Sequence, residues 1–375
     1  MDIRRRLRFI PWPPLFLGIA MQTGQVLVTG ANGFVGKWTV LELLRAGFAV
    51  RGTVRSESRA EAVRQAVASH VGAGALSRLD FVRLDLMQDR GWLEAMEGID
   101  AVAHVAAQIV AEEPKDMQVV IGPALEGTER VLRHAVQADV RRVVMTSSIA
   151  TVGYGLGHTA GKRTYTEADF TNLDGMKFTW AYCVGKTQAE RAAWAYARAE
   201  GLRLTTIHPG AILGPALDAD ASVSLQMVSG LLEGSTPAMP SNGFSVVDVR
   251  DVAAMHVAAL QQPETEGQRY LATARYLPFP EVADILRRAY PDREITSRQV
   301  PDWIIKLLAR FGGPARQIIN DIGNEKHFDG SKGERLLGRP YISAEDAVLS
   351  AAESVIRLGL LKPKGASAPN AGTAP

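Results

Sequence analysis

The chain has 375 residues, of which 46% are hydrophobic and 22% charged. A chain of this size and composition can bury a large core, in one big domain or two smaller ones. Lysine and arginine number 42 against 40 aspartates and glutamates, so the net charge of +2 provides no general field for nucleic acid or an anionic membrane. No apolar run has the length that spans a bilayer. We therefore expect neither nucleic acid nor a membrane as a partner.

The two ends of the chain are expected to lie outside the folded part. Residues 1 to 21 combine a cluster of arginines with three prolines within four residues, which favours a disordered extension over a secretory signal. The tail, residues 362 to 375, is rich in proline, glycine, alanine and serine and has nothing to bury. The single cysteine, Cys183, excludes an intrachain disulfide and suits a cytoplasmic location.

Short apolar runs alternate with helical patterns through the first half of the chain. Consecutive apolar positions, separated by helices, indicate parallel strands covered on both faces. This pattern predicts an α/β fold with a doubly wound parallel sheet, a Rossmann fold, over residues 22 to 210. The expected strands lie at residues 25–30, 48–55, 79–86, 99–107, 141–148 and 202–210.

The alternation loosens after Pro209. We expect residues 211 to 361 to form a smaller, mainly helical C-terminal substrate cap, with helices around 279–290, 301–311 and 343–357. A late sheet segment near 244–260 should interleave this cap with the sheet domain.

A glycine-rich loop follows the first expected strand. Gly30, Gly33 and Gly36 stand three apart directly before a helix. Such glycines permit a tight turn, close approach to a pyrophosphate and close helix packing, while the helix N-terminus offers free N–H groups to the phosphates. The strand before and the helix after give this spacing the context that a dinucleotide site requires. The expected contacts in this loop are Gly30, Asn32, Gly33, Phe34, Val35 and Gly36.

The end of the second strand indicates which dinucleotide is bound. An NAD site usually has an acidic residue there, whereas this chain has Arg55, with Arg51 four positions earlier. A guanidinium favours the 2′-phosphate of NADP(H) over the ribose hydroxyls of NAD(H). Asp85, after the third strand, is placed to meet the adenine edge, although simple helix capping is the alternative.

Several motifs together resemble an extended short-chain dehydrogenase/reductase. They are TGANGFVG, DL at 85–86, HVAA at 104–107, TSS at 146–148, YCVGK at 182–186 and HPG at 208–210. The stretches GFAVRGTVRS, PALEGTERVL and AYCVGKTQAERAAW look most like the branch of dihydroflavonol reductases, cinnamoyl-CoA reductases and microbial aldehyde or ketone reductases. The resemblance implies further cofactor contacts from Leu86, Val105, Ala106, Ala107, Thr128, Tyr182, Lys186, Pro209 and Gly210.

Tyr182 and Lys186 stand one helical turn apart, a spacing that suits proton transfer. Reduction of a carbonyl needs a proton donor, and a phenol near the oxygen can serve. Lowering a phenol pKa of about 10 by about three units takes roughly 4 kcal/mol. An ammonium about 4 Å away, at an effective dielectric of about 20, supplies roughly that amount, so we expect Lys186 to lower the pKa of Tyr182. Ser148 should polarise the carbonyl, with Ser147 as the alternative.

The leading hypothesis is an NADPH-dependent carbonyl reductase that converts an aldehyde or ketone to an alcohol. Dihydroflavonol reductases place a flavonoid-contacting asparagine five positions after the serine, where this chain has Gly153, so we expect a smaller substrate. The alternatives are a nucleotide-sugar epimerase or dehydratase that retains NAD, and a non-catalytic NADP(H) sensor. The seven histidines lack metal-ligand spacing, so no metal is expected. We expect a monomer or a homodimer.

Overall fold

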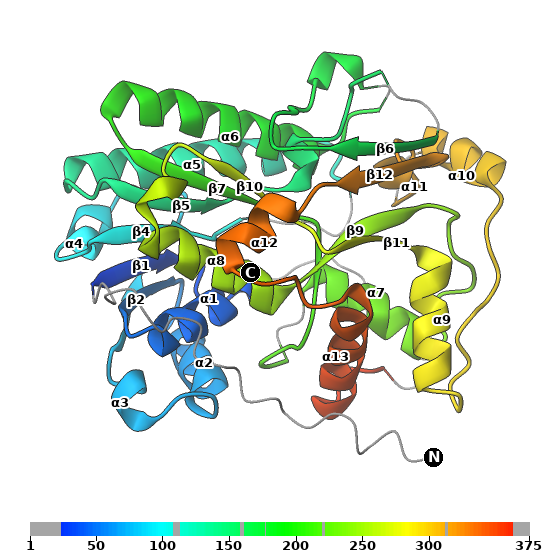
Figure 1. Ribbon diagram of the computed structural model, residues 1–375, viewed down its shortest axis with the longest axis horizontal. Helices are drawn as coiled ribbons and strands as arrows, with labels where there is room; N and C mark the ends of the chain where they lie inside the picture. The colour runs from blue at the N-terminus through cyan, green and yellow to red at the C-terminus, as the bar shows by residue number, and fades with distance from the viewer. Residues whose placement is uncertain are drawn as a thin grey trace.

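The computed structural model describes residues 24–107, 113–157, 161–176, 178–219, 222–311 and 314–362. The expected extension, residues 1–21, lies outside this part of the chain, as does nearly all of the expected tail at 362–375. Figure 1 shows a central sheet between two layers of helices, with a second group of smaller elements beside it.

Seven parallel strands form the central sheet, in the order β10-β7-β5-β4-β1-β2-β3. The chain reverses its direction of winding between β1 and β4, which neighbour each other. The predicted doubly wound fold is therefore confirmed, and six of the seven strands lie where the sequence predicted them. The strands are β1 (Gln25–Thr29), β2 (Ala49–Val54), β3 (Leu79–Arg83), β4 (Ala101–His104), β5 (Arg142–Thr146), β7 (Arg203–Pro209) and β10 (Arg269–Ala272).

Helices cover both faces of this sheet, as buried apolar strands require. On one face α5 packs along α6 and contacts α4 (Figure 1). Leu132 of α5 and Met145 of β5 belong to the core on this face. On the other face α1 contacts α2 and α8 around Leu41 and Val252. These helices are α1 (Phe34–Arg45), α2 (Glu57–Ala68), α4 (Trp92–Met96), α5 (Gln118–Gln137), α6 (Ala181–Glu200) and α8 (Val249–Gln261), and the short α3 (Ala73–Leu76) follows α2.

The cap combines helices with two small sheets. A three-stranded sheet in the order β11-β9-β8 shares a core with α7, α9 and α13, and β12 pairs with β6 in parallel. The strands are β6 (Gly161–Tyr165), β8 (Ala211–Leu213), β9 (Gly243–Asp248), β11 (Arg275–Pro278) and β12 (Asn324–Phe328). The helices are α7 (Val223–Leu232), α9 (Phe279–Ala289), α10 (Asp302–Leu308), α11 (Pro314–Ile318), α12 (Ser331–Leu337) and α13 (Ala344–Arg357).

The segment expected near 244–260 as a late part of the sheet is a strand followed by a helix. Its first part is β9, which pairs within the small three-stranded sheet, and the rest is α8, which covers the main sheet. The chain returns to the main sheet later, through β10, which pairs with β7. The strand β10 has only four residues, all buried, so it shows no alternation that would mark it as a strand.

Candidate active site

A cavity of about 830 Å³ opens at the carboxyl ends of the parallel strands. Its wall is formed by the segments that follow β1, β2, β3, β4 and β5, by the start of α6, and by Gly210, Ala211, Ile212, Ser222 and Ser224. The neighbouring strands β1 and β4 are the point at which the sheet changes its direction of winding. Open α/β sheets bind their ligands at this point, so the fold places a ligand site here.

The glycine loop between β1 and α1 forms one side of this cavity. Gly30 has a φ of +65°, and a Cβ added to it would stand 2.8 Å from the Cα of Ala106. A Cβ on Gly36 would stand only 2.1 Å from the carbonyl oxygen of Gly30, so α1 begins directly against the end of β1. All six expected loop contacts line the cavity: Gly30, Asn32, Gly33, Phe34, Val35 and Gly36.

These residues fit a dinucleotide. The first N–H groups of α1 have no partner within the helix, and the helix dipole adds partial positive charge at the same end. Because the loop glycines have no side chains, a pyrophosphate can approach this backbone closely. The chemistry of the loop therefore agrees with the role that its sequence predicts.

Thr29 fixes the part of the wall beside the glycine loop. Its hydroxyl oxygen accepts hydrogen bonds from the backbone N–H groups of Val105 and Ala106, both at 3.1 Å, and lies 2.8 Å from Nδ1 of His104. One side chain thus links the ends of β1 and β4. Val105, Ala106 and Ala107 all lie on the cavity wall, as expected.

The far end of the cavity carries Arg55 and Asp85. Arg55 follows β2 directly and its exposed side chain lines the wall. Asp85 also lines the wall, beside Leu86, and its Oδ1 accepts a hydrogen bond from the N–H of Met87 at 2.9 Å. Asp85 therefore caps a turn and not a helix, because the next helix, α4, begins only at Trp92.

The structure does not bring Arg51 to the cavity. Its guanidinium donates to the carbonyl oxygens of Ala95, at 2.8 Å, and Glu97, at 2.9 Å, which ties β2 to the end of α4. Arg51 precedes Arg55 by four residues, which is about 13 Å along a strand, whereas the site lies at the carboxyl end. Arg51 is therefore not positioned as a cofactor contact.

The two serines after β5 point in different directions. Ser148 lines the cavity, and its Oγ accepts a hydrogen bond from the N–H of Ala150 at 3.1 Å. Ser147 is turned into the core, where its Oγ donates to Oε2 of Glu190 at 2.8 Å. Tyr182, at the start of α6, lines the same wall and hydrogen-bonds with Ser148. Of the two serines, only Ser148 shares the cavity with Tyr182.

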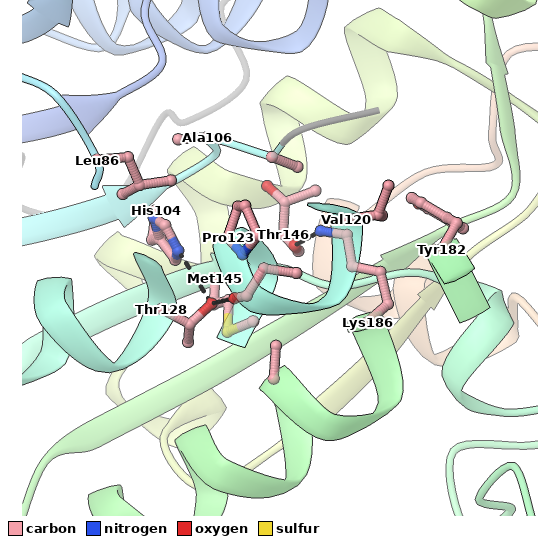
Figure 2. A pocket seen from close by; sticks show the side chains of 13 residues that line it. Leu86, His104, Ala106, Val120, Pro123, Thr128, Met145, Thr146, Tyr182 and Lys186 are labelled. Atoms are coloured by element: carbon pink, nitrogen blue, oxygen red, sulfur yellow. Dashed lines mark hydrogen bonds between the residues drawn. The ribbon is translucent and has the colours of Figure 1, made fainter. Parts of the chain in front are cut away.

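Lys186 lies behind Tyr182 in a small pocket of about 20 Å³, which has room for one water molecule (Figure 2). Its Nζ donates to the carbonyl oxygen of Thr146 at 3.0 Å. Thr128 belongs to this pocket and not to the cavity wall: its Oγ1 donates to the carbonyl of Ala124 at 2.8 Å and lies 3.5 Å from Nε2 of His104. Thr128 thus shares the small pocket of Lys186, behind the cavity wall.

Of the two expected contacts Pro209 and Gly210, only Gly210 lies on the cavity wall. Gly210 lines the cavity, where a Cβ would stand 2.1 Å from the carbonyl oxygen of Ser245. Pro209 ends β7 as a buried residue and is not on the cavity wall.

Burial dominates the titration of the site. It raises the pKa of Tyr182 above the usual phenol value, and the hydrogen bond with Ser148 only partly opposes this. Burial lowers the pKa of Lys186 to about 8, against the attraction of Glu190. In the structure described, burial outweighs the attraction expected from Lys186, whose ammonium is directed to the carbonyl oxygen of Thr146. At neutral pH Tyr182 holds its proton and most of Lys186 is charged.

Beyond Ser148 and Tyr182, the cavity is bounded by aromatic side chains. Tyr154 and Trp180 line it and meet edge to face, with ring centroids 5.1 Å apart. Gly153 lies beside them, and a Cβ there would stand 2.7 Å from Cζ of Phe328. The space next to Gly153 is thus filled by a ring from β12, and neither residue lies on the cavity wall.

Sequence reasoning missed Glu190, whose carboxylate joins the serine strand to the helix of Tyr182. The signal was available, because Tyr182, Lys186 and Glu190 stand four residues apart and so share one face of α6. Within the described ranges no group of three or more histidine, cysteine, aspartate or glutamate side chains is placed to hold a metal. No helix of the described part has the length and apolarity to cross a membrane.

Comparison with known proteins agrees with this site. The NAD dependent epimerase/dehydratase family matches residues 26–272. Cinnamoyl-CoA reductase 1 of Petunia hybrida is 36% identical over 281 residues, covering 74% of this chain and 80% of the relative. Dihydroflavonol 4-reductase of Zea mays is 33% identical over 287 residues, covering 74% and 78%. Yeast methylglyoxal/isovaleraldehyde reductase complexed with NADPH superposes with a TM-score of 0.72 at 24% identity, covering 89% of this chain and 99% of that chain.

The fold and the site define an oxidoreductase with a Rossmann-type dinucleotide site. The chain belongs to the NAD dependent epimerase/dehydratase family, the extended short-chain dehydrogenases/reductases, and is similar to their cinnamoyl-CoA and dihydroflavonol reductase branch. The predicted family and branch resemblance are thus confirmed. The solved structure shares the fold.

Proposed function

We propose that the protein reduces an aldehyde or ketone to an alcohol with NADPH. The observation that carries this proposal is the shared cavity, in which Ser148 and Tyr182 face the same space as the glycine loop that begins at Gly30. When bound in its reduced form, the dinucleotide supplies the hydride. The loop residues and the N-terminus of α1 would hold its pyrophosphate, and Lys186 would hold the ribose next to the reacting ring.

The residues of the chain supply the proton and the charge stabilisation. The Ser148 hydroxyl donates a hydrogen bond to the substrate oxygen, which stabilises negative charge as it develops there. The Tyr182 O–H bond then breaks and its proton passes to that oxygen, giving the alcohol. A pKa above the usual phenol value keeps this proton in place at neutral pH, which suits reduction more than oxidation. The Lys186 ammonium, one turn along α6, stabilises the phenolate until it is reprotonated.

We propose NADP(H) as the preferred cofactor because Arg55 stands on the wall where an NAD site would carry a carboxylate. Its guanidinium can pair with a 2′-phosphate through two hydrogen bonds. The substrate would be a small neutral carbonyl compound, since Tyr154 and Trp180 provide aromatic walls and position 153 has a glycine where dihydroflavonol reductases place an asparagine. The cap would determine substrate specificity through Ile212, Ser222 and Ser224, which line the cavity.

The test is the loss of NADPH absorbance with purified protein and a panel of aromatic and aliphatic aldehydes, ketones and keto esters. The Tyr182→Phe variant is the control, because it removes the proton donor and keeps the ring. We expect turnover with NADPH that falls at least about 100-fold in the variant, while the Kd for NADPH is unchanged. Clear NADPH binding with no turnover across the panel would contradict the proposal and favour an enzyme with retained NAD or a sensor.

A further inference from the structure

Glu190 is a buried carboxylate with several polar neighbours. It lies on α6 with no exposed surface. Its Oε2 accepts from Ser147 Oγ at 2.8 Å, and its Oε1 accepts from Arg269 Nε at 2.9 Å and from Trp194 Nε1 at 3.1 Å. His208 Nε2 lies 3.3 Å from the same Oε1. The carboxylate thus joins α6 to the ends of β5, β7 and β10.

These neighbours keep Glu190 charged. Burial opposes its ionisation, but His208, Arg269 and the hydrogen bonds from Thr151 and Ser147 hold the pKa of Glu190 below its usual value. Burial also lowers the pKa of His208 to about 4, so at neutral pH this ring is an uncharged hydrogen-bonding partner. The guanidinium of Arg269 is therefore the positive charge that faces the carboxylate from β10.

The position of Glu190 relates it to the catalytic groups that we propose. Lys186 lies between Tyr182 and Glu190, one helical turn from each, on the same face of α6. The other titratable groups near Lys186 are His104 on β4 and His208 on β7, and burial lowers the pKa of His104 to about 3, so both rings are neutral. Burial lowers the pKa of Lys186 to about 8, and the attraction of the Glu190 carboxylate, one turn away, opposes this lowering.

We propose that Glu190 is a positioning residue of this site: its carboxylate, one turn from Lys186 on the same face of α6, is a counter-charge for the buried ammonium, and the hydrogen bond that it accepts from Ser147 fixes the strand end that carries Ser148. The inference rests on the proposed function for its catalytic consequence. A carboxylate that only packed the core would be costly to bury, and an apolar side chain of similar volume would serve as well. The glutamate here has two positive charges to balance, the Arg269 guanidinium that it contacts and the Lys186 ammonium one turn away.

The test measures the titration of Lys186 directly. Protein labelled with 13C at the lysine side chain is followed by NMR from pH 6 to pH 10, and the Lys186 signal is assigned by its loss in Lys186→Arg. In Glu190→Gln, which removes the charge and keeps the shape, we expect the midpoint of Lys186 to fall by about one to two pH units. Where turnover is present, the alkaline limit of kcat/KM should move by the same amount.

Two control variants separate charge from structure. Glu190→Asp keeps a carboxylate but shortens the side chain, so it should lower the melting temperature while the Lys186 midpoint stays closer to the original value than in Glu190→Gln. Trp194→Phe removes one hydrogen bond to the same Oε1 and leaves the charge, so the midpoint should not move. The proposal is overturned if Lys186 titrates alike in Glu190→Gln and the original protein, or if Trp194→Phe shifts it equally. Because NMR needs no turnover, inactivity on every carbonyl would count against the proposed function alone.

Discussion

Lowering the pH from 7 to 5 should destabilise the fold strongly, because three histidines are buried in uncharged form. Burial lowers the pKa of His104 to about 3 and those of His208 and His256 to about 4, against 6.5 for the exposed side chain. In this range the unfolded chain binds protons that the folded chain does not. Stability contributed by these rings is therefore present above pH 6.5 and is lost as the pH falls toward 4.

The magnitude follows from the size of the shifts. At pH 5 each histidine costs about 2 kcal/mol of unfolding free energy, or about 6 kcal/mol for the three. Asp251 acts in the opposite direction, because burial raises its pKa to about 6. At pH 5 it binds a proton in the folded state, which adds about 1 kcal/mol to the free energy of unfolding. The net loss of about 5 kcal/mol is comparable with the whole stability of many domains.

Urea unfolding at several pH values, followed by circular dichroism, measures this loss. His256 provides the internal check, because its ring is held between the carbonyl of Val252, at 2.7 Å, and Thr146 Oγ1, at 2.8 Å, away from the cavity wall. His256→Gln should reduce the difference between pH 7 and pH 5 by about 2 kcal/mol. An unfolding free energy that changes by less than about 1 kcal/mol over this range in the original protein would refute the reasoning.

Three further predictions concern single side chains. Ser148→Ala should lower kcat by about 100-fold or more. Ser147→Ala should mainly lower the melting temperature, because the Ser147 hydroxyl donates a hydrogen bond to Glu190. Equal losses of kcat in the two variants would contradict the assignment of Ser148. Arg55→Ala should raise the Kd for NADPH by about 10-fold and leave that for NADH nearly unchanged, as measured by fluorescence titration; a parallel rise for both would mean that Arg55 does not contact the 2′-phosphate. Gly36→Ala should cost about 1–3 kcal/mol or more in urea unfolding, since its Cβ would stand 2.1 Å from the Gly30 carbonyl, and unchanged stability would show that α1 can move away.

The sequence predicted those parts of the fold that repeat a simple pattern. Six parallel strands and the glycine loop depend on local apolar runs and on spacing along the chain, and the structure has them at the expected places. The strand β10 was not predicted, because its four residues are all buried and show no alternation of apolar and polar positions. The pairing of β6 with β12 joins segments far apart in sequence, and no local pattern encodes such a contact.

The sequence predicted which residues lie near the candidate site better than it predicted where their side chains point. The positions of Ser148 and Tyr182 on the cavity wall follow from their places at a strand end and a helix start. The separation of Arg51 from the cavity depends on which carbonyls its guanidinium meets. The raised pKa of Tyr182 depends on burial, which the Tyr182 and Lys186 spacing does not disclose.

The contact between Gly153 and Phe328 couples the sequence changes that are possible in two segments far apart in the chain. A side chain at position 153 would meet the Phe328 ring at 2.7 Å, so this position cannot gain even a methyl group until the ring becomes smaller or moves. A change at position 153 therefore depends on residue 328: the Phe328 ring must move aside or be replaced by a smaller side chain when position 153 gains a side chain. This dependence restricts the evolutionary routes from this chain to an enzyme with a polar contact at position 153.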